Sequence, residues 1–185
     1  MSILLKLSID EYDRMIARGA FDGLDKRIEL IYGELREMNP AGPVHEDIIS
    51  YLTRWSVEST SDRQVSVRVQ CGLGIPELES VPEPDIAWIR HGRYRQRRPE
   101  PADVLLLIEV ADSSLTYDLH EKLQMYSIAG VKEYWVVNVP AECVEVHRNP
   151  TKKGYRKKEI FHAGASISPA EAPHASLDLA KLFAG

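Results

Sequence analysis

The chain has little cysteine, no long apolar run and no excess of positive charge. Its two cysteines among 185 residues, Cys71 and Cys143, form neither a disulfide framework nor a zinc motif, which favours a reducing, cytoplasmic compartment. No apolar run reaches the roughly 20 residues that span a bilayer. The N-terminus has only a short apolar run and lacks a cleavage site, so it is not expected to be a signal peptide. No membrane partner is expected. The net charge of −5 gives no overall attraction to nucleic acid, although local fields can still steer such a partner.

Apolar residues make up 44% of the chain, enough for a single domain over residues 1–185 with a sizeable core. Ser8 and Glu11 have capping-box spacing and predict a short first helix that ends at Gly19. Two alternating runs flank Tyr32-Gly33 and predict a hairpin. Two of its acids are Glu29 and Glu34, and solvent exposure is the ordinary interpretation of each one taken alone.

A helix is expected to follow the Pro/Gly loop at 40–43. Its predicted buried stripe is Val44, Ile48, Leu52 and Trp55. Glu46 in the first turn suits the helix dipole and needs no further explanation. His45 beside it is either an ordinary surface residue or a residue that faces a cleft.

The next segments predict a sheet. Residues 64–75 alternate between apolar and polar side chains, which is typical of a half-buried strand. Apolar strands then alternate with a helix, and a hairpin and a short C-terminal helix at 177–183 follow. This order favours an α/β fold, a mixed sheet with helices on its faces.

Two of the predicted strands carry carboxylates where a core is expected. Asp85 opens one strand, and Glu109 lies in the almost wholly apolar strand 104–110. An ionised carboxylate in an apolar setting is costly unless it is paired or bound to a metal. Asp85 and Glu109 therefore indicate a divalent-cation site.

The helix after Glu109 adds an inward-facing cation. At about 100° per residue, Leu119, Leu123 and Tyr126 form one apolar arc, and Lys122 falls inside it. A lysine on the buried side of a helix is unusual. Asp85, Glu109 and Lys122 are thus expected to converge from three consecutive elements.

Residues 90–98, RHGRYRQRR, form a basic loop. Most such charge runs are solvated loops. The alternative is a phosphate-binding loop next to the carboxylates, with Tyr94 free to stack on a base. The candidate nucleic-acid-binding residues are Arg93, Arg95, Arg97 and Arg98.

Taken in order, these features resemble the PD-(D/E)XK nuclease superfamily and its bacterial branch of restriction-endonuclease-like proteins. The resemblance rests on Pro84-Asp85, Glu109-Val110, Asp118, Lys122, the run from Gly130 to Trp135, the hairpin from Glu29 to Glu34, and His45. It implies a restriction-endonuclease-like core, α-β-β-β-α-β, with an added N-terminal hairpin. That core would span about 27–148, and a C-terminal hairpin and helix would occupy 149–185.

The resemblance also implies a metal-dependent endonuclease that hydrolyses phosphodiester bonds of nucleic acid, with DNA as the expected substrate. Asp85 and Glu109, with the Val110 carbonyl, would hold Mg²⁺ or Mn²⁺, and Lys122 would complete the catalytic set. The superfamily pattern has a lysine two residues after the glutamate, but this chain has Ala111 there. In the branch that the chain resembles, the lysine lies on the following helix, where this chain has Lys122. Glu34, His45 and Glu46 are possible supporting residues.

Other interpretations stay open at this point. Asp85 could cap a turn, and Glu109 could form a buried salt bridge with Lys122, which is a weak stabiliser. The chain could be a catalytically degenerate module that binds nucleic acid or a protein, or a hydrolase of another phosphoester. A homodimer is expected on general grounds, because two sites related by a twofold axis suit the two strands of a duplex.

Overall fold

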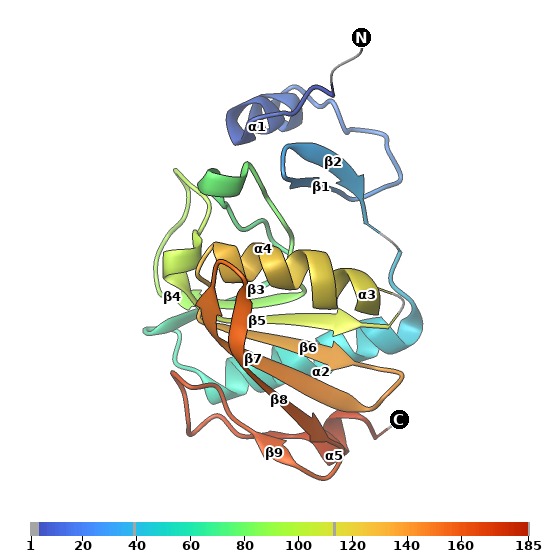
Figure 1. The fold of residues 1–185 in the computed structure, drawn as a ribbon, viewed down its shortest axis with the longest axis vertical. Coiled ribbons are helices and arrows are strands. Elements are labelled where there is room, and N and C mark those ends of the chain that lie inside the picture. Colours follow the sequence, from blue (N-terminus) through green and yellow to red (C-terminus); the bar gives the residue numbers. More distant parts are fainter. Residues whose placement is uncertain (1–3, 39, 113, 185) are drawn as a thin grey trace.

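The computed structural model describes residues 4–38, 40–112 and 114–184. Its centre is a six-stranded sheet in the order β3-β4-β5-β6-β7-β8 (Figure 1). Neighbouring strands pair antiparallel except β5 and β6, which are parallel. The strands are β3 (Val65–Val69), β4 (Ile86–Arg90), β5 (Val104–Ala111), β6 (Glu133–Asn138), β7 (Cys143–Thr151) and β8 (Gly154–His162).

A helical crossover joins the parallel strands β5 and β6, as parallel pairing requires. It runs through α3 (Leu115–Tyr117), a π-helical turn η3 (Asp118–Lys122) and α4 (Leu123–Ile128). Gly130 follows with a φ of 84°, a left-handed conformation that ends the helix. The element order from α2 (Pro43–Ser59) to β6 is therefore α-β-β-β-α-β, and the predicted fold class is confirmed.

Two apolar cores lie on opposite faces of the sheet, because successive strand residues point to opposite sides. On one face, α2 packs with its buried Ile48, Leu52 and Trp55 against Trp88 and Trp135. On the other face, α4 packs through residues that include Met125 and Tyr126. The C-terminal segment, β9 (Ser166–Ile167), β10 (Leu177–Asp178) and α5 (Leu179–Leu182), covers part of the α2 face.

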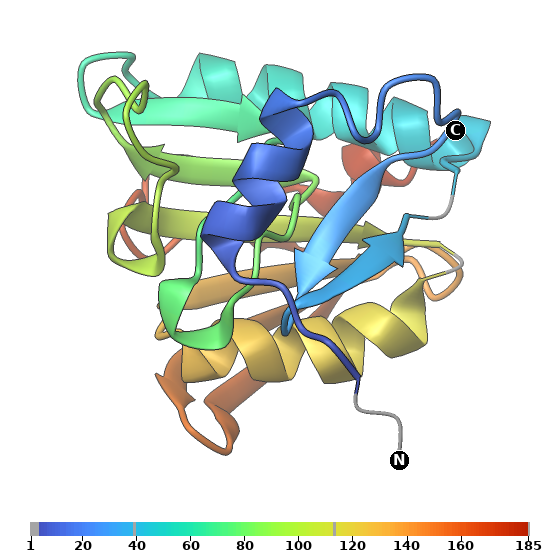
Figure 2. The same cartoon turned by 90° about the horizontal axis from the view of Figure 1, so that it is seen from above.

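The N-terminal elements are an addition to this core. The helix α1 (Ile9–Ala17) begins with the predicted capping box of Ser8 and Glu11. The predicted hairpin is formed by β1 (Ile28–Ile31) and β2 (Glu34–Glu37), with positive φ at Tyr32 and Gly33. Seen from above, the hairpin lies between α2 and α4 (Figure 2). Two short 3₁₀ turns, η1 (Pro76–Leu78) and η2 (Pro101–Asp103), complete the described elements.

Some predicted details were wrong. The strand expected at 64–75 stops at Val69, because Gln70 takes a left-handed φ of 48°, and Leu73 and Ile75 then pack into the core from a loop. Val44 is 55% exposed, and Ile49 joins the buried stripe of α2 instead. The C-terminal helix is shorter than the predicted 177–183, because Leu177 and Asp178 form β10 and the helix spans only Leu179–Leu182.

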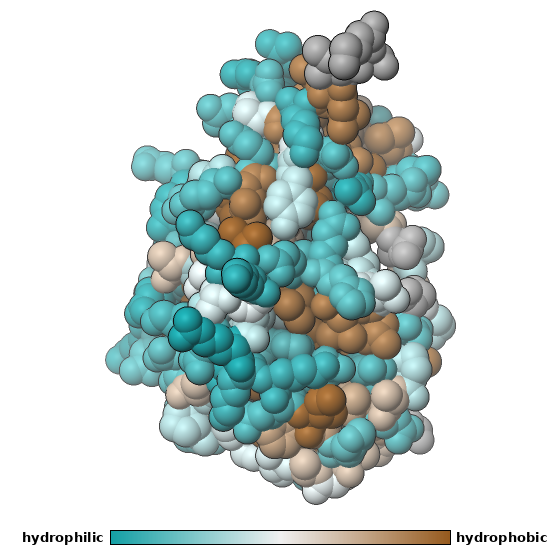
Figure 3. Space-filling model, in the orientation of Figure 1, coloured by the Kyte–Doolittle hydropathy of each residue, from teal (hydrophilic) through white to brown (hydrophobic). Residues whose placement is uncertain are grey.

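The described residues include no helix that is long and apolar enough to cross a bilayer. The face shown in Figure 3 is mainly hydrophilic, with apolar areas between the polar ones.

Candidate active site

The two carboxylates that the sequence singled out meet at one end of the central strands. Asp85 directly precedes β4, and Glu109 lies near the end of β5. Because β4 and β5 are antiparallel, the start of one lies beside the end of the other. The backbone N–H of Asp85 donates to Oε2 of Glu109 at 3.3 Å, and the N–H of Val110 donates to Oδ2 of Asp85 at 2.8 Å. Strand pairing therefore fixes both carboxylates relative to each other.

Asp85 is held as an anion by its neighbours. It is 5% exposed, and the side-chain amide of Gln70 donates to its Oδ1 at 3.2 Å. Burial opposes ionisation, but the hydrogen bond and charge of His45 and the N–H of Val110 outweigh burial and lower the pKa of Asp85. An anchored, ionised carboxylate at a strand start is suited to hold a cation.

His45, in the first turn of α2, faces this carboxylate and not the surface. Its Nε2 lies 3.3 Å from Oδ2 of Asp85, and this contact raises the pKa of His45. Its Nδ1 is buried and has no hydrogen-bond partner in the described structure. His45 therefore orients Asp85.

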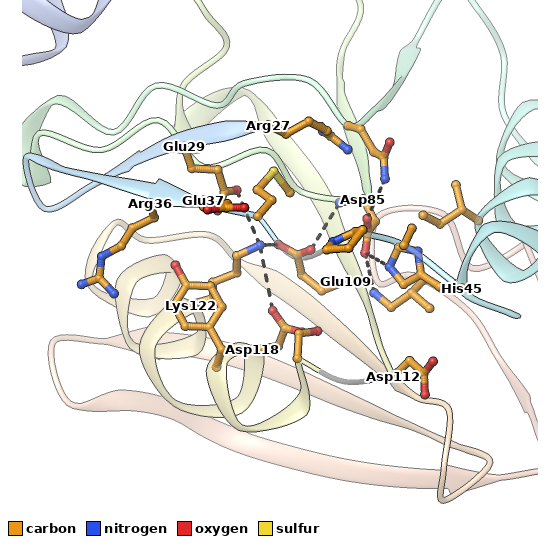
Figure 4. Close-up of a pocket in the computed structure, with 18 of the residues that line it drawn as sticks. Arg27, Glu29, Arg36, Glu37, His45, Asp85, Glu109, Asp112, Asp118 and Lys122 are labelled. Carbon is orange, nitrogen blue, oxygen red and sulfur yellow. Dashed lines mark hydrogen bonds and ion pairs between the residues drawn. The ribbon is translucent and has the colours of Figure 1, made fainter. Parts of the chain in front are cut away.

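Lys122 is buried and forms an ion pair with Glu109 (Figure 4). Its Nζ donates to Oε1 of Glu109 at 3.0 Å, and the hydroxyl of Tyr126 donates to the same oxygen at 3.0 Å. The inward orientation of Lys122 was predicted from helical phase and is confirmed. Burial raises the pKa of Glu109 well above its ordinary value, and Lys122 only partly opposes this.

Two further carboxylates surround the Lys122 ammonium. Oε1 of Glu29 lies 3.7 Å from Nζ, and Oδ1 of Asp118 lies 3.9 Å from it. Both acids are 2% exposed. Burial alone would lower the pKa of Lys122, but the three carboxylates outweigh burial and raise that pKa well above its ordinary value. The lysine is therefore charged, in a site with more negative than positive groups.

A π-helical turn presents Asp118 and Lys122 to the site from the same side of the crossover. Such turns are rare and often occur at functional sites. The backbone carbonyl of Asp118 accepts the hydroxyl of Tyr134 at 3.1 Å, which ties the turn to β6. This contact fixes the turn, and with it the base of the Lys122 side chain.

These groups lie in an open cleft of about 1330 Å³. Its walls come from the N-terminal hairpin and the segment before it, the start of α2, and the α3–η3 crossover. Nine acidic and four basic residues line it. The acids are Asp25, Glu29, Glu37, Glu46, Asp85, Glu109, Asp112, Asp118 and Glu121, and the bases are Lys26, Arg27, Arg36 and Lys122. A cleft with this excess of carboxylates attracts cations.

The donor set fits a hard divalent cation. The described residues hold no ready-made group of three or more His, Cys, Asp or Glu ligands. Mg²⁺, however, keeps several waters and needs only one or two protein carboxylates. Asp85 and Glu109 could supply oxygen ligands in an acidic cleft, where a cation would favour the ionised form of Glu109 against the burial that raises its pKa.

The supporting residues proposed from the sequence have different positions. His45 and Glu46 both line the cleft, although Glu46 is exposed on its helix. Glu34 does not line the cleft and pairs with Arg36 and Lys6 instead. Of the two hairpin acids Glu29 and Glu34, it is Glu29 that lines the cleft and approaches Lys122.

The arginine loop is not next to the carboxylates, so that expectation was wrong. The loop joins the end of β4 to the start of β5, whereas the carboxylates lie at the start of β4 and the end of β5. None of Arg93, Arg95, Arg97 and Arg98 lines the cleft. Arg97 pairs with Asp103 at 2.7 Å, and Arg98 pairs with Asp13 of α1 at 2.6 Å.

Glu29, Asp118, Tyr126 and Gln70 contribute to the site without having been predicted for it. Asp118 had a detectable signal, because the helical phase that places Lys122 inward also places Asp118 near that arc. The sequence could not distinguish Glu29 from Glu34, since both side chains face the same side of the hairpin. Only the docking of the hairpin onto residues 79–83 brings Glu29 to Lys122.

Comparison with known proteins agrees with this architecture. A crystal structure described as a putative nuclease belonging to DUF820, from Anabaena variabilis, superposes with a TM-score of 0.75. The match covers 96% of this chain and 97% of that chain at 16% sequence identity, so it shows a shared fold. Among curated proteins, none matches the chain. A family model named Uma2 and described as "Putative restriction endonuclease" matches residues 9–180, and the chain therefore belongs to this restriction-endonuclease-like family.

Proposed function

We propose that this protein is a metal-dependent endonuclease that hydrolyses phosphodiester bonds of DNA. The observation that carries the proposal is the contact between Lys122 and Glu109, 3.0 Å apart and buried beside Asp85 at the base of an open cleft. Family membership and the nuclease-like fold support a nuclease. The metal and the DNA substrate are the parts that experiment must test.

Each residue of the site has a role that follows from its surroundings. Asp85 and Glu109 would hold Mg²⁺ or Mn²⁺, which supplies a water of lowered pKa and positive charge beside the phosphate. The Lys122 ammonium faces the same space and stabilises negative charge that develops on the phosphate oxygens. His45 holds the Asp85 carboxylate in its orientation through the 3.3 Å contact.

The position of Lys122 compensates for the absence of a lysine on β5. Ala111, two residues after Glu109, is wholly buried and has no charge to offer. Lys122 lies on the helical crossover that follows β5, and its Nζ still donates to Oε1 of Glu109. An ammonium delivered from the helix can therefore serve the role that a strand lysine has in the superfamily.

Cleavage of supercoiled plasmid DNA tests the proposal. The purified parent, with Mg²⁺ or Mn²⁺, is expected to nick the plasmid, and excess chelator is expected to stop it. Glu109→Gln keeps the size of the side chain and should abolish nicking. Glu133→Gln is a matched control, because Glu133 is equally buried but pairs with Arg148, and neither residue lines the cleft.

The outcomes separate the candidate functions. Metal-dependent nicking by the parent and by Glu133→Gln, but not by Glu109→Gln, supports the endonuclease. A parent that binds DNA and cleaves neither DNA nor RNA under any metal would instead indicate a degenerate binding module. Cleavage of RNA but not of DNA would support phosphodiester hydrolysis and would show that RNA is the substrate.

A further inference from the structure

We propose that Glu29, on the N-terminal hairpin, is a positioning residue that holds the Lys122 ammonium in place when Glu109 engages a cation. This inference rests on the proposed function. It gives the added hairpin a part in the chemistry of the core, which neither the family match nor the fold match assigns.

The backbone that follows Glu29 is fixed to the core at two points. The following residue, Leu30, is fully buried, and its carbonyl accepts the N–H of Val81 at 2.6 Å. At the turn, the N–H of Gly33 donates to the carbonyl of Glu79 at 2.9 Å. The hairpin therefore does not swing freely over the cleft.

The carboxylate of Glu29 is fixed as well. Its Oε1 accepts the N–H of Glu83 at 2.6 Å, two residues before Asp85. The same oxygen lies 3.7 Å from Nζ of Lys122. One carboxylate thus links the segment that carries Asp85 to the helical turn that carries Lys122.

The need for such a residue follows from the contacts of Glu109. Its Oε1 is the acceptor within hydrogen-bond distance of Lys122, and it already accepts Tyr126. A cation on Glu109 would compete with Lys122 for the same carboxylate and repel the ammonium. Glu29 and Asp118, at 3.7 and 3.9 Å, are the anions that can then retain it.

Glu29 is better placed for this task than Asp118. Asp118 lies one helical turn from Lys122 on the same element, so it moves with the lysine. Glu29 comes from a separate element that is docked on the loop before Asp85, and it therefore fixes Lys122 relative to that carboxylate. Figure 4 shows both acids pointing toward the ammonium.

A double-mutant cycle in the metal-free protein tests the contact without reference to activity. Tm is measured for the parent, Glu29→Gln, Lys122→Met and the double variant. If Glu29 and Lys122 interact, the double variant loses less Tm than the two single losses combined. Glu133→Gln combined with Lys122→Met is the control pair and should be additive.

Kinetics then distinguish positioning from a merely structural role. Glu29→Gln should lower kcat by about tenfold to a hundredfold with little change in KM, since small misplacements of a catalytic group have effects of this size. Glu133→Gln should lower Tm and keep kcat. Additive Tm losses in the Glu29–Lys122 cycle, or a parental kcat for Glu29→Gln, would overturn the inference. Coupled Tm losses in a parent that cleaves nothing would instead contradict the proposed function on which the inference rests.

Discussion

Nζ of Lys122 lies 3.0 Å from Oε1 of Glu109, although the two residues come from a helical crossover and from the strand before it. Both side chains are buried, and the nearest additional anions are Glu29 and Asp118. The desolvation cost of burying two charges offsets much of their attraction, so a buried ion pair is a weak stabiliser. The arrangement is therefore a poor choice for stability alone and is better explained by a chemical role.

Divalent-cation binding is expected to depend on Asp85. Mn²⁺ should raise the Tm of the parent, because a ligand that binds only the folded state adds about 2.7 kcal/mol at a hundredfold excess over Kd. Asp85→Asn removes the charge and should lose most of this increase, as measured by a thermal scan with and without Mn²⁺. The Glu133→Gln control should keep the increase. An equal Mn²⁺ response in Asp85→Asn and the parent would place the cation elsewhere.

Nucleic-acid affinity is expected to depend on the basic residues that line the cleft and not on the arginine loop. Arg36 lines the cleft, whereas Arg93 and Arg95 lie on the loop at the other end of β4 and β5. Arg36→Ala should weaken DNA binding and reduce the dependence of log Kd on log salt by about one phosphate contact. The double variant Arg93→Ala/Arg95→Ala should bind as the parent does. Fluorescence anisotropy at several salt concentrations measures both effects. The reverse pattern would show that the arginine loop, and not Arg36, contacts the nucleic acid.

Stability is expected to fall at acidic pH through His147. This residue is 3% exposed on β7, beside Glu145 at 3.4 Å and the rings of Tyr134 and Tyr155, with Lys158 pairing with the same glutamate. Burial lowers the pKa of His147 below 6.5, and Glu145 only partly opposes this. Below pH 6.5 the unfolded chain therefore binds more protons at this position than the folded chain, so stability decreases as pH falls.

Urea midpoints at pH 7.5 and pH 5.5 measure this contribution. His147→Gln cannot titrate and should show a smaller decrease between the two values of pH than the parent. His162→Gln, an exposed histidine on β8, should behave as the parent does. An unchanged decrease in His147→Gln would show that other groups cause the acid sensitivity.

The core on the α2 face is expected to be sensitive to truncation at Trp88. Its ring lies 5.0 Å from that of Trp55, and Trp135 stacks on the same tryptophan at 6.0 Å. Trp88→Ala should reduce the free energy of unfolding by about 3–5 kcal/mol. Val57→Ala, at a position of α2 that is 59% exposed, should change it by less than about 0.5 kcal/mol. Chemical denaturation checks both values, and a small effect of Trp88→Ala would contradict the assigned core.

The element order and the convergence of three candidate site residues could be predicted because each rests on a local signal. Asp85 and Glu109 are acids next to or within apolar strands, and a helix of known period decides which way Lys122 points. These signals need only the sequence within one element. The position of Asp85 beside Glu109 then follows from antiparallel pairing of the two strands.

The position of Glu29 relative to the cleft depends on how the elements pack together. A local sequence pattern does not contain that information. In the hairpin, Glu29 and Glu34 face the same side, and only contacts with residues 79–83 decide which one reaches Lys122. The position of the arginine loop, in contrast, follows from the strand order alone. If Asp85 starts one strand and Glu109 ends the next one antiparallel to it, the loop between them must lie at the opposite end.

The proposed role of Lys122 is tested most directly by single-turnover DNA cleavage by Lys122→Met, with Mn²⁺ binding measured on the same sample. Lys132→Met is the control, because Lys132 is an exposed residue just after the crossover. Lys122→Met should have a lower Tm than the parent but remain folded at the assay temperature, bind Mn²⁺ and lose cleavage, while Lys132→Met should cleave as the parent does. Cleavage by Lys122→Met at the parental rate would rule out the proposed active site, because the buried ammonium would then have no part in the chemistry.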